Sequence, residues 1–350
     1  MRALTVIPLH KGSAELTEVP DPAPGDGELL VQGLALGICG TDIEIVGGEY
    51  GWAPPGAERL VLGHESLGRV RSAPAGSDFA EGDLVVGVVR RPDPVPCGAC
   101  AAGQFDMCRN GQYTERGIKE IHGYGSELWT VEADYALKLD PGLETVGVLM
   151  EPTTVVAKAW DHIGRIAERA YTEQHRVLVT GAGPIGLLAA MLGVQRGLEV
   201  HVLDRVSEGL KPDLVRALGA TYHSGSVADA VRGAAPDVVV EATGVGQLVF
   251  DAMQETAAGG IVCLTGVSPT GRALQVDAGA INRELVLEND VVFGSVNANL
   301  RHYHLAAEAL ARADRSWLER LITRRVPLTR FEEALERRPD DVKVVLDLTA

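Results

Sequence analysis

The sequence has few basic residues for its length. Its 350 residues include 32 Lys and Arg against 48 Asp and Glu, which gives a formal net charge of −16. A phosphate backbone or an anionic membrane surface needs a basic face on its protein partner. The charge balance therefore argues against a general nucleic-acid-binding protein and against a protein that binds acidic membranes.

Cysteine is also scarce, and its spacing is uneven. Cys39 and Cys263 stand apart, whereas Cys97, Cys100 and Cys108 fall within twelve residues. An extracellular disulfide framework normally has an even and well-spread set of cysteines. The amino-terminal segment is polar and shows no secretory signal. These observations predict reduced cysteines in a cytoplasmic protein, and they favour metal binding over disulfide formation in the cluster.

The sequence contains no uninterrupted apolar run of membrane-spanning length. Residues 177–194 carry no charge, but four glycines and one proline divide them. Such residues break an apolar run into a short strand, a turn and a helix. We therefore predict no transmembrane helix.

The apolar content that is present predicts two domains. Hydrophobic residues make up 46% of the chain and charged residues 23%, which excludes intrinsic disorder. In the first 150 residues, short apolar runs such as 28–36 and 82–89 alternate with Gly/Pro turns, and this pattern predicts a β-rich domain. Between 152 and 290, predicted strands alternate with predicted helices, which is typical of βαβ units with a parallel sheet. The predicted strands are 175–181, 199–204, 236–244 and 259–266, and the predicted helices are 184–197 and 212–220.

A glycine motif opens the helix at 184–197. It has the pattern GxGxxG, follows an apolar strand and precedes a second strand. The first glycine permits a tight turn, the second lets the backbone approach a pyrophosphate, and the third lets the helix pack against the strand. The helix N-terminus then offers N–H groups to the phosphates. The candidate cofactor-binding residues of this loop are Gly181, Gly183, Pro184, Ile185 and Gly186.

The second strand ends in an acidic residue, Asp204. A carboxylate at this position accepts hydrogen bonds from the adenosine ribose and repels a 2′-phosphate, which favours NAD. Arg205 follows directly and would attract that phosphate, so NADP stays possible. Thr243, near the end of the predicted strand at 236–244, is a further candidate cofactor-binding residue.

A second group of residues suggests a metal site. Cys39 lies in GICGTD, His64 and Glu65 lie in LGHES, and Glu151 begins EPTTVV. A thiolate, an imidazole and carboxylates from different loops make a plausible zinc site with one position open for substrate. The spacing of 25 residues between Cys39 and His64 matches no short motif, so a role of these residues in the core stays open.

Taken in order, these motifs resemble the zinc-dependent medium-chain dehydrogenase/reductase family. GICGTD, GHE, the cysteine cluster, the EP dipeptide and the glycine motif occur in the family's order along essentially the whole chain. The segments VVRRP, DMCRNGQYTERGI, HGY and LMEPTTVVAKAW look most like its glucose 1-dehydrogenase (aldose dehydrogenase) branch.

The resemblance implies an α/β fold with a GroES-like, β-rich catalytic domain and a Rossmann domain with a doubly wound parallel sheet. The catalytic domain would cover residues 1–151 and 296–350, and the Rossmann domain residues 152–295.

The resemblance also implies roles for individual residues. The catalytic zinc would be bound by Cys39 and His64, with Glu65 and Glu151 as carboxylate partners that also serve catalysis. Thr41 would relay the substrate proton. Glu115 and Asn297 would bind sugar hydroxyls, with Glu151 also at the substrate and Asn297 also at the cofactor. Val89 stands where some members of the family have a polar Asn, which removes one sugar contact.

The cysteine cluster resembles the family's structural zinc lobe, so that one catalytic and one structural zinc per chain are implied. The family's first cysteine is replaced by Pro94, which cannot bind zinc, and Asp93 beside it is a candidate fourth ligand. A different fourth ligand, a water molecule or a metal-free lobe stay open. Cys263 lies within an apolar strand and is predicted to be a core residue.

The implied reaction is hydride transfer from the anomeric carbon of an aldose, with D-glucose favoured, to NAD(P)⁺, which yields the aldonolactone. A zinc-dependent polyol or secondary-alcohol dehydrogenase is the first alternative. A zinc-free quinone or enone reductase and a nucleotide-binding protein without turnover stay open. The resemblance further implies a homodimer or homotetramer.

Overall fold

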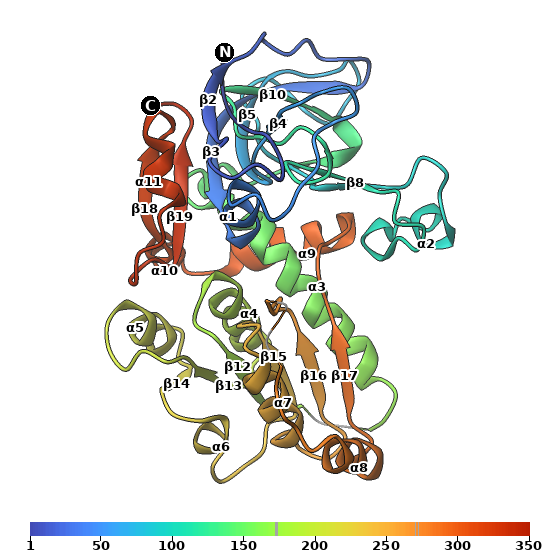
Figure 1. Ribbon diagram of the computed structural model, residues 1–350, viewed down its shortest axis with the longest axis vertical. Coiled ribbons are helices and arrows are strands. Elements are labelled where there is room, and N and C mark those ends of the chain that lie inside the picture. Colours follow the sequence, from blue (N-terminus) through green and yellow to red (C-terminus); the bar gives the residue numbers. More distant parts are fainter. Residues whose placement is uncertain (172–173, 270, 272) are drawn as a thin grey trace. The chain divides into compact units, whose positions relative to one another are not determined.

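The computed structural model describes residues 1–171, 174–269, 271 and 273–350, and the chain forms two compact units (Figure 1). The first unit contains Met1–Glu151 and Ala298–Ala350, and the second contains Pro152–Asn297. The chain passes from the first unit to the second in the first turn of helix α3 (Met150–Ala167).

The first unit is built mainly from β-strands, as the sequence predicts for its first 150 residues. Its long strand β3 (Glu28–Ile38) pairs with β5 (Glu65–Ser72), β10 (Leu128–Glu132) and β19 (Lys343–Asp347). Because β19 is the last strand of the chain, this pairing brings the carboxyl-terminal segment next to β3. The other strands are β1 (Arg2–Val6), β2 (Glu15–Glu18), β4 (Leu60–Val61), β6 (Leu84–Gly87), β7 (Arg90–Arg91), β8 (Thr114–Arg116), β9 (Glu120–Ile121), β11 (Ala136–Lys138) and β18 (Ile322–Pro327).

These strands form three sheets, with the orders β2-β1-β4, β11-β6-β5-β3-β19-β18 and β7-β8-β9, and β10 pairs with β3 beside the second of them. The α-helices of the unit are short or come late in the chain. They are α1 (Gly40–Val46), α2 (Gly98–Ala101), α9 (Leu300–Arg312), α10 (Arg315–Leu321) and α11 (Phe331–Leu335). The sequence analysis did not predict α10 or β18.

Short 3₁₀ helices connect several of these elements: η1 (Phe105–Met107), η2 (Ala133–Tyr135), η3 (Pro141–Leu143), η4 (Gly147–Leu149) and η5 (Leu328–Arg330).

The burial of β3 explains its place in the unit. Its residues alternate between buried and half-buried at first and are all buried over the last four positions. Alternation is typical of a strand with one covered face, and continuous burial of a strand covered on both faces.

The second unit contains a parallel sheet of the strands β12 (Arg176–Thr180), β13 (Glu199–Leu203), β14 (Thr221–His223), β15 (Val238–Glu241), β16 (Ile261–Leu264) and β17 (Val291–Gly294). Their order is β14-β13-β12-β15-β16-β17, and every neighbouring pair is parallel. The strand order reverses between β12 and β15, which is the order of the Rossmann fold. The predicted fold class is thereby confirmed for this unit.

Helices connect the strands of this sheet: α4 (Pro184–Gln195), α5 (Leu210–Ala217), α6 (Val227–Ala230), α7 (Gly246–Gln254) and α8 (Ala278–Glu288). Strand β15 is buried at all four positions, and β12 at all but the first. Such continuous apolar runs are expected when helices cover both faces of a parallel sheet. None of the helices in the described part of the chain combines the length and the apolar character that a bilayer crossing requires.

Candidate active site

The first unit brings together a thiol, an imidazole and a carboxylate. Cys39 is the N-cap of α1 and directly follows β3, while His64 and Glu65 stand at the start of β5. The Cys39 Sγ lies 3.1 Å from the His64 Nε2, and one ligand atom from each of the three residues lies within 4.8 Å of the others. Because β3 and β5 are neighbours, the sheet itself brings these three side chains together.

Asp42, which the sequence analysis did not single out, supports this group. Its carboxylate accepts a hydrogen bond from the Cys39 backbone N–H at 2.9 Å, and its other oxygen lies 3.6 Å from the His64 Nδ1. The Asp42 side chain is fully buried. A carboxylate behind a ligating histidine orients the imidazole ring and strengthens it as a metal ligand. Asp42 is part of the GICGTD segment, and its spacing from Cys39 is the signal that identifies it.

Lys343 is a second supporting residue that the sequence analysis missed. It begins β19, is buried, and forms an ion pair with the Glu65 carboxylate. Its Nζ also donates a hydrogen bond to the Ile38 carbonyl oxygen at 3.1 Å. Burial opposes the charged form of Lys343, but the charge of Glu65 holds the pKa of the lysine above its ordinary value.

The electrostatics of the group indicate a place for a cation. Burial raises the pKa of the Cys39 thiol, although the neighbouring imidazole opposes this shift. Burial alone would lower the pKa of His64, but Cys39 and Asp42 raise it well above its usual value. Burial, together with the charge of Glu65, raises the pKa of Glu151 to about 7. Acidic groups thus surround one imidazole, and burial favours their neutral forms unless a cation lies among them. Sulfur, nitrogen and oxygen donors are the set that zinc binds.

The other predicted residues of this unit lie on different elements. Glu151 is in the first turn of α3, and Thr41 is in α1, two residues after Cys39. Glu115 is buried on β8, where its Oε1 accepts hydrogen bonds from the Nε and Nη2 of Arg90 at 3.0 and 2.9 Å. Val89 is buried among the apolar core residues of the unit.

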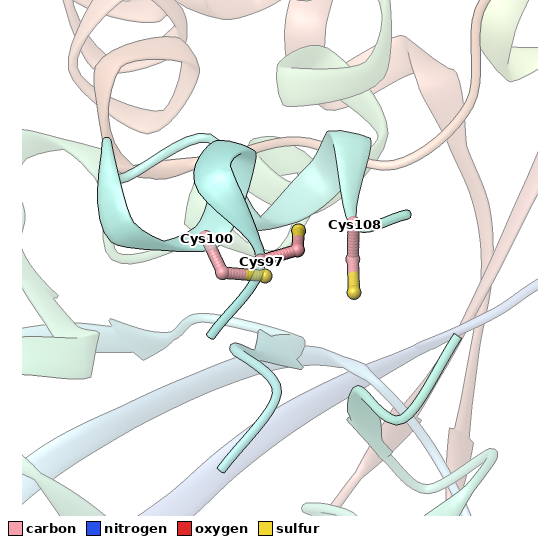
Figure 2. A group of neighbouring side chains, drawn as sticks. All are labelled: Cys97, Cys100 and Cys108. Carbon is pink, nitrogen blue, oxygen red and sulfur yellow. The ribbon is translucent and has the colours of Figure 1, made fainter. Parts of the chain in front are cut away.

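The cysteine cluster lies on α2 and the segment after η1. Cys97 is the N-cap of α2, Cys100 is within it, and Cys108 follows η1 (Figure 2). The three sulfur atoms all lie within 4.8 Å of one another. Hydrogen bonds from backbone N–H groups, first that of Arg109, lower the pKa of Cys97 to about 6. Burial raises the pKa of Cys100 to about 11.

Asp93 is not part of this group of three thiols. Its Oδ1 accepts a hydrogen bond from the Val95 backbone N–H at 2.8 Å. Its Oδ2 is buried and has no hydrogen-bond partner among the described residues. The assignment of Asp93 as a fourth ligand therefore stays a prediction. A buried carboxylate oxygen without a partner is compatible with it.

The glycine motif of the second unit forms a tight turn between β12 and α4. Gly181 has φ +94°, which favours glycine, and Gly183 is the N-cap of α4 with Pro184 at its first position. A Cβ added to Gly186 would lie 1.7 Å from the Gly181 carbonyl oxygen, so only glycine lets the helix begin here. Ile185 lies within the first turn of the same helix.

Asp204 lies directly after β13, at the carboxyl edge of the sheet. Its Oδ2 accepts a hydrogen bond from the Ala182 backbone N–H at 2.7 Å, and its Oδ1 accepts one from the Arg205 N–H at 2.7 Å. Lys211, which the sequence analysis missed, places its Nζ 3.5 Å from Asp204. The carboxylate is thus accompanied by two basic residues, of which Arg205 is exposed.

Two further candidates follow other strands of the same sheet. Thr243 comes two residues after β15, and its backbone N–H and hydroxyl both donate to the Glu241 carboxylate. Asn297 comes three residues after β17 and has φ +61°, a conformation that Asn adopts more readily than most residues. The Nζ of the buried Lys158 donates to the Val296 carbonyl oxygen just before it at 2.9 Å.

The chain is similar to known proteins in sequence and in fold. Residues 25–158 match the alcohol dehydrogenase GroES-like domain, and residues 144–348 match the glucose dehydrogenase C-terminus. The chain is 41% identical to the glucose 1-dehydrogenase of Methanocella arvoryzae, and the match covers 100% of each chain. The chain belongs to the glucose dehydrogenase family. The glucose 1-dehydrogenase of Thermoproteus tenax is also 41% identical, over 99% of each chain.

A solved glucose dehydrogenase has the same fold. The Haloferax mediterranei enzyme in complex with NADP, zinc and gluconolactone matches with a TM-score of 0.91 and 33% identity, over 99% of each chain. These similarities confirm the predicted family and the predicted class of enzyme, an oxidoreductase. They also confirm the predicted fold class, a GroES-like domain with a Rossmann domain.

Proposed function

We propose that the protein oxidises an aldose, with D-glucose favoured, at its anomeric carbon and transfers the hydride to NAD(P)⁺, yielding the aldonolactone. The observation that carries this proposal is that the half-buried Cys39 lies together with the buried His64 and Glu65 in a member of the glucose dehydrogenase family. The complex of the Haloferax mediterranei relative with NADP, zinc and gluconolactone supports the substrate class, the cofactor and the metal.

The residues of this group fit a catalytic zinc ion. Cys39 and His64 would hold it, with Glu65 and Glu151 as carboxylate partners. When bound, zinc supplies a Lewis acid that lowers the pKa of a coordinated hydroxyl group. Asp42 would keep the His64 ring in its ligating orientation.

The protein's own side chains would bind the sugar and move its proton. Thr41, close to Cys39 in α1, would accept the proton of the reacting hydroxyl and pass it on. Glu115 would accept hydrogen bonds from sugar hydroxyls, with Arg90 fixing its carboxylate in place. Asn297 would donate to the sugar and the cofactor, and Glu151 would contact the substrate at the metal. Buried polar partners of this kind discriminate strongly against substrates that lack the matching hydroxyl.

The dinucleotide would bind at the carboxyl edge of the parallel sheet, in a domain formed by residues 152–295. Its pyrophosphate would lie at the N-terminus of α4, where N–H groups point outward. Asp204 would accept hydrogen bonds from the adenosine ribose, which favours NAD. Arg205 and Lys211 would offset the repulsion of a 2′-phosphate, so that NADP is also accepted.

A second zinc ion would bind the cysteine cluster. Cys97, Cys100 and Cys108 would be three ligands and Asp93 the fourth. The ion would hold the α2 lobe in its fold and take no part in the reaction.

We also propose a cytoplasmic homodimer or homotetramer. Strand β17 is the last strand of its sheet, and its residues Val291, Val292 and Phe293 are only half-buried. An edge strand of this kind pairs readily with another chain.

The test is a substrate panel with NAD and NADP measured separately. It contains glucose, galactose and xylose, together with polyols and simple secondary alcohols, before and after zinc removal by a chelator. The proposal expects aldose oxidation that zinc removal abolishes. Turnover of polyols without any aldose would favour the zinc-dependent polyol dehydrogenase, which the apolar Val89 makes the second candidate.

A matched pair of variants tests the sugar contact. Glu115→Gln is expected to raise the KM for the aldose at least 10-fold, because a buried acceptor for hydroxyl groups is lost. Glu120→Gln changes the exposed residue opposite Glu115 in the β8–β9 register and is expected to leave the KM within about 2-fold. Equal effects of both variants would remove Glu115 from the sugar site.

A further inference from the structure

Glu241 is a fully buried acidic residue at the end of β15. Its Oε1 accepts hydrogen bonds from the Thr243 backbone N–H at 2.8 Å, from the Thr243 hydroxyl and from the Thr180 hydroxyl at 3.2 Å. Its Oε2 accepts a hydrogen bond from the Gly244 backbone N–H at 3.1 Å. These donors are neutral N–H and O–H groups, so the carboxylate acts here as a multiple acceptor.

The main-chain carbonyl of the same residue connects to the next strand. It accepts hydrogen bonds from the Thr265 backbone N–H at 2.8 Å, from the Thr265 hydroxyl at 2.8 Å and from the Gly266 N–H at 3.0 Å. A Cβ added to Gly266 would lie 2.1 Å from the Gly244 nitrogen and 2.8 Å from the Glu241 Oε2. The turns after β15 and β16 are therefore packed tightly around Glu241.

The sheet register explains why one residue reaches three strand ends. Thr180 of β12 is the register partner of Glu241, and Glu241 is the partner of Leu264 in β16. The strand order reverses between β12 and β15, and dinucleotides bind across such a reversal, outside the carboxyl ends of the strands. Asp204, directly after β13, marks the adenosine side. The nicotinamide half of the dinucleotide then belongs on the side of β15 and β16.

We propose that Glu241 is a positioning residue for the nicotinamide half of the dinucleotide. It holds the turn at Thr243 and Gly244 against the end of β12, and so forms the floor on which that half of the cofactor lies. Thr243 lies close to the glycine turn: a Cβ added to Gly181 would lie 2.9 Å from the Thr243 Cγ2. This inference rests on the proposed dinucleotide site of the second unit.

A comparison of the hydrogen-bonding groups of glutamate and glutamine explains why this position requires a carboxylate. Gln has nearly the same shape, but one of its two terminal atoms is a donor, so it cannot accept all four hydrogen bonds. In Glu241→Gln, the Thr243 and Gly244 N–H groups would compete for a single acceptor, and the turn would move. We expect the affinity for NADPH to fall about 10- to 100-fold, the range for a buried donor left without a partner.

The experiment compares two ligands of the full-length protein. NADPH binding is followed by its fluorescence, and 5′-AMP, which has only the adenosine half, by calorimetry. Glu241→Gln is expected to weaken NADPH as stated and to leave 5′-AMP within about 3-fold, since Asp204 and its partners are unchanged. The control is Glu199→Gln, at the amino end of β13, which is separated from β15 by β12, where the half-exposed carboxylate pairs with Arg176. It is expected to bind both ligands like the wild type.

A second pair of variants keeps the test open if Glu241→Gln fails to fold. Thr180→Val preserves the side-chain shape and removes one donor to Glu241, whereas Thr180→Ser preserves the hydroxyl. The proposal expects weaker NADPH binding for the valine variant and recovery for the serine variant. Unchanged NADPH binding in Glu241→Gln and Thr180→Val, or an equal loss of NADPH and 5′-AMP, would overturn it. A wild-type protein that binds neither NADPH nor NADH would instead overturn the proposed function.

Discussion

The buried ion pair of Lys343 and Glu65 leads to a prediction on stability. Both side chains are 2% exposed, and the lysine Nζ also donates to the Ile38 carbonyl oxygen. The variant Lys343→Met keeps most of the alkyl chain and removes the charge. It leaves the Glu65 carboxylate buried without its cation.

The magnitude follows from this burial. Removing one partner of a buried ion pair costs about 3–5 kcal/mol, because the other charge stays behind without compensation. For a unit of this size, each kcal/mol lowers the melting temperature by roughly 2–4 °C, so a decrease of roughly 6–20 °C is expected. The assay is calorimetric melting of protein freed of metal by a chelator, with guanidinium denaturation as an independent measure.

An exposed ion pair in the same unit provides the control. Lys138 lies 2.7 Å from Asp83, and its side chain is 47% exposed. Lys138→Met is expected to change the free energy of unfolding by about 1 kcal/mol or less. Addition of Glu65→Gln to Lys343→Met is expected to restore part of the loss, because no unpaired charge is then buried. If Lys343→Met melts like Lys138→Met, the argument from burial of the pair is wrong.

Three further predictions follow from the described contacts. Gly186→Ala places a Cβ against the Gly181 carbonyl oxygen. Thermal melting is expected to show that it destabilises the second unit by about 1–3 kcal/mol, and fluorescence titration that it abolishes NADPH binding. Cys108→Ser is expected to lower the zinc content from two ions to one per chain by atomic absorption, and retention of two would refute the assignment of the cluster. Burial would raise the pKa of Glu132, but Arg91 holds it at about 2, against 4.5 in the unfolded chain. This lowered pKa stabilises the protein above pH 4.5, and the contribution disappears as the pH falls from 4.5 towards 2. The Glu132 side chain is 39% exposed, so solvent screening reduces the contribution to about 1 kcal/mol. Urea denaturation is therefore expected to separate Glu132→Gln from the wild type in full at pH 7 and by less than half of that difference at pH 3.

Much of the dinucleotide domain was predictable from the sequence. The strands at 175–181 and 236–244 were expected from apolar runs, and the structure has β12 at Arg176–Thr180 and β15 at Val238–Glu241. The signals are local, since buried parallel strands are apolar along their whole length and a glycine motif marks the turn between a strand and a helix. In the first unit, by contrast, helix α10 and strand β18 were not predicted.

The residues that support the candidate site were less predictable. Lys343 pairs with Glu65 from a distance of 278 residues along the chain, and no local pattern marks it. Arg90 and Glu115 form a buried ion pair across neighbouring strands, although the sequence analysis treated only Glu115 as functional. Asp42 lies within the GICGTD segment, but a sequence shows which residue types can bind a metal and does not show which carboxylate lies behind a ligating histidine.

The sequence by itself determined which chemical groups the protein has and which local turns it forms. The Gly181–Gly186 turn depends on the positive φ of Gly181 and on the close approach of the backbone at Gly186, both of which favour glycine. The donors Cys39 and His64 are visible in their segments. Only the tertiary structure decided which charges are buried together. Lys343 meets Glu65 because β19 pairs with β3, and Glu241 meets Thr180 because β15 pairs with β12. Strand pairing over long distances creates these contacts, and a buried charge is tolerated only where such a pairing supplies its partners.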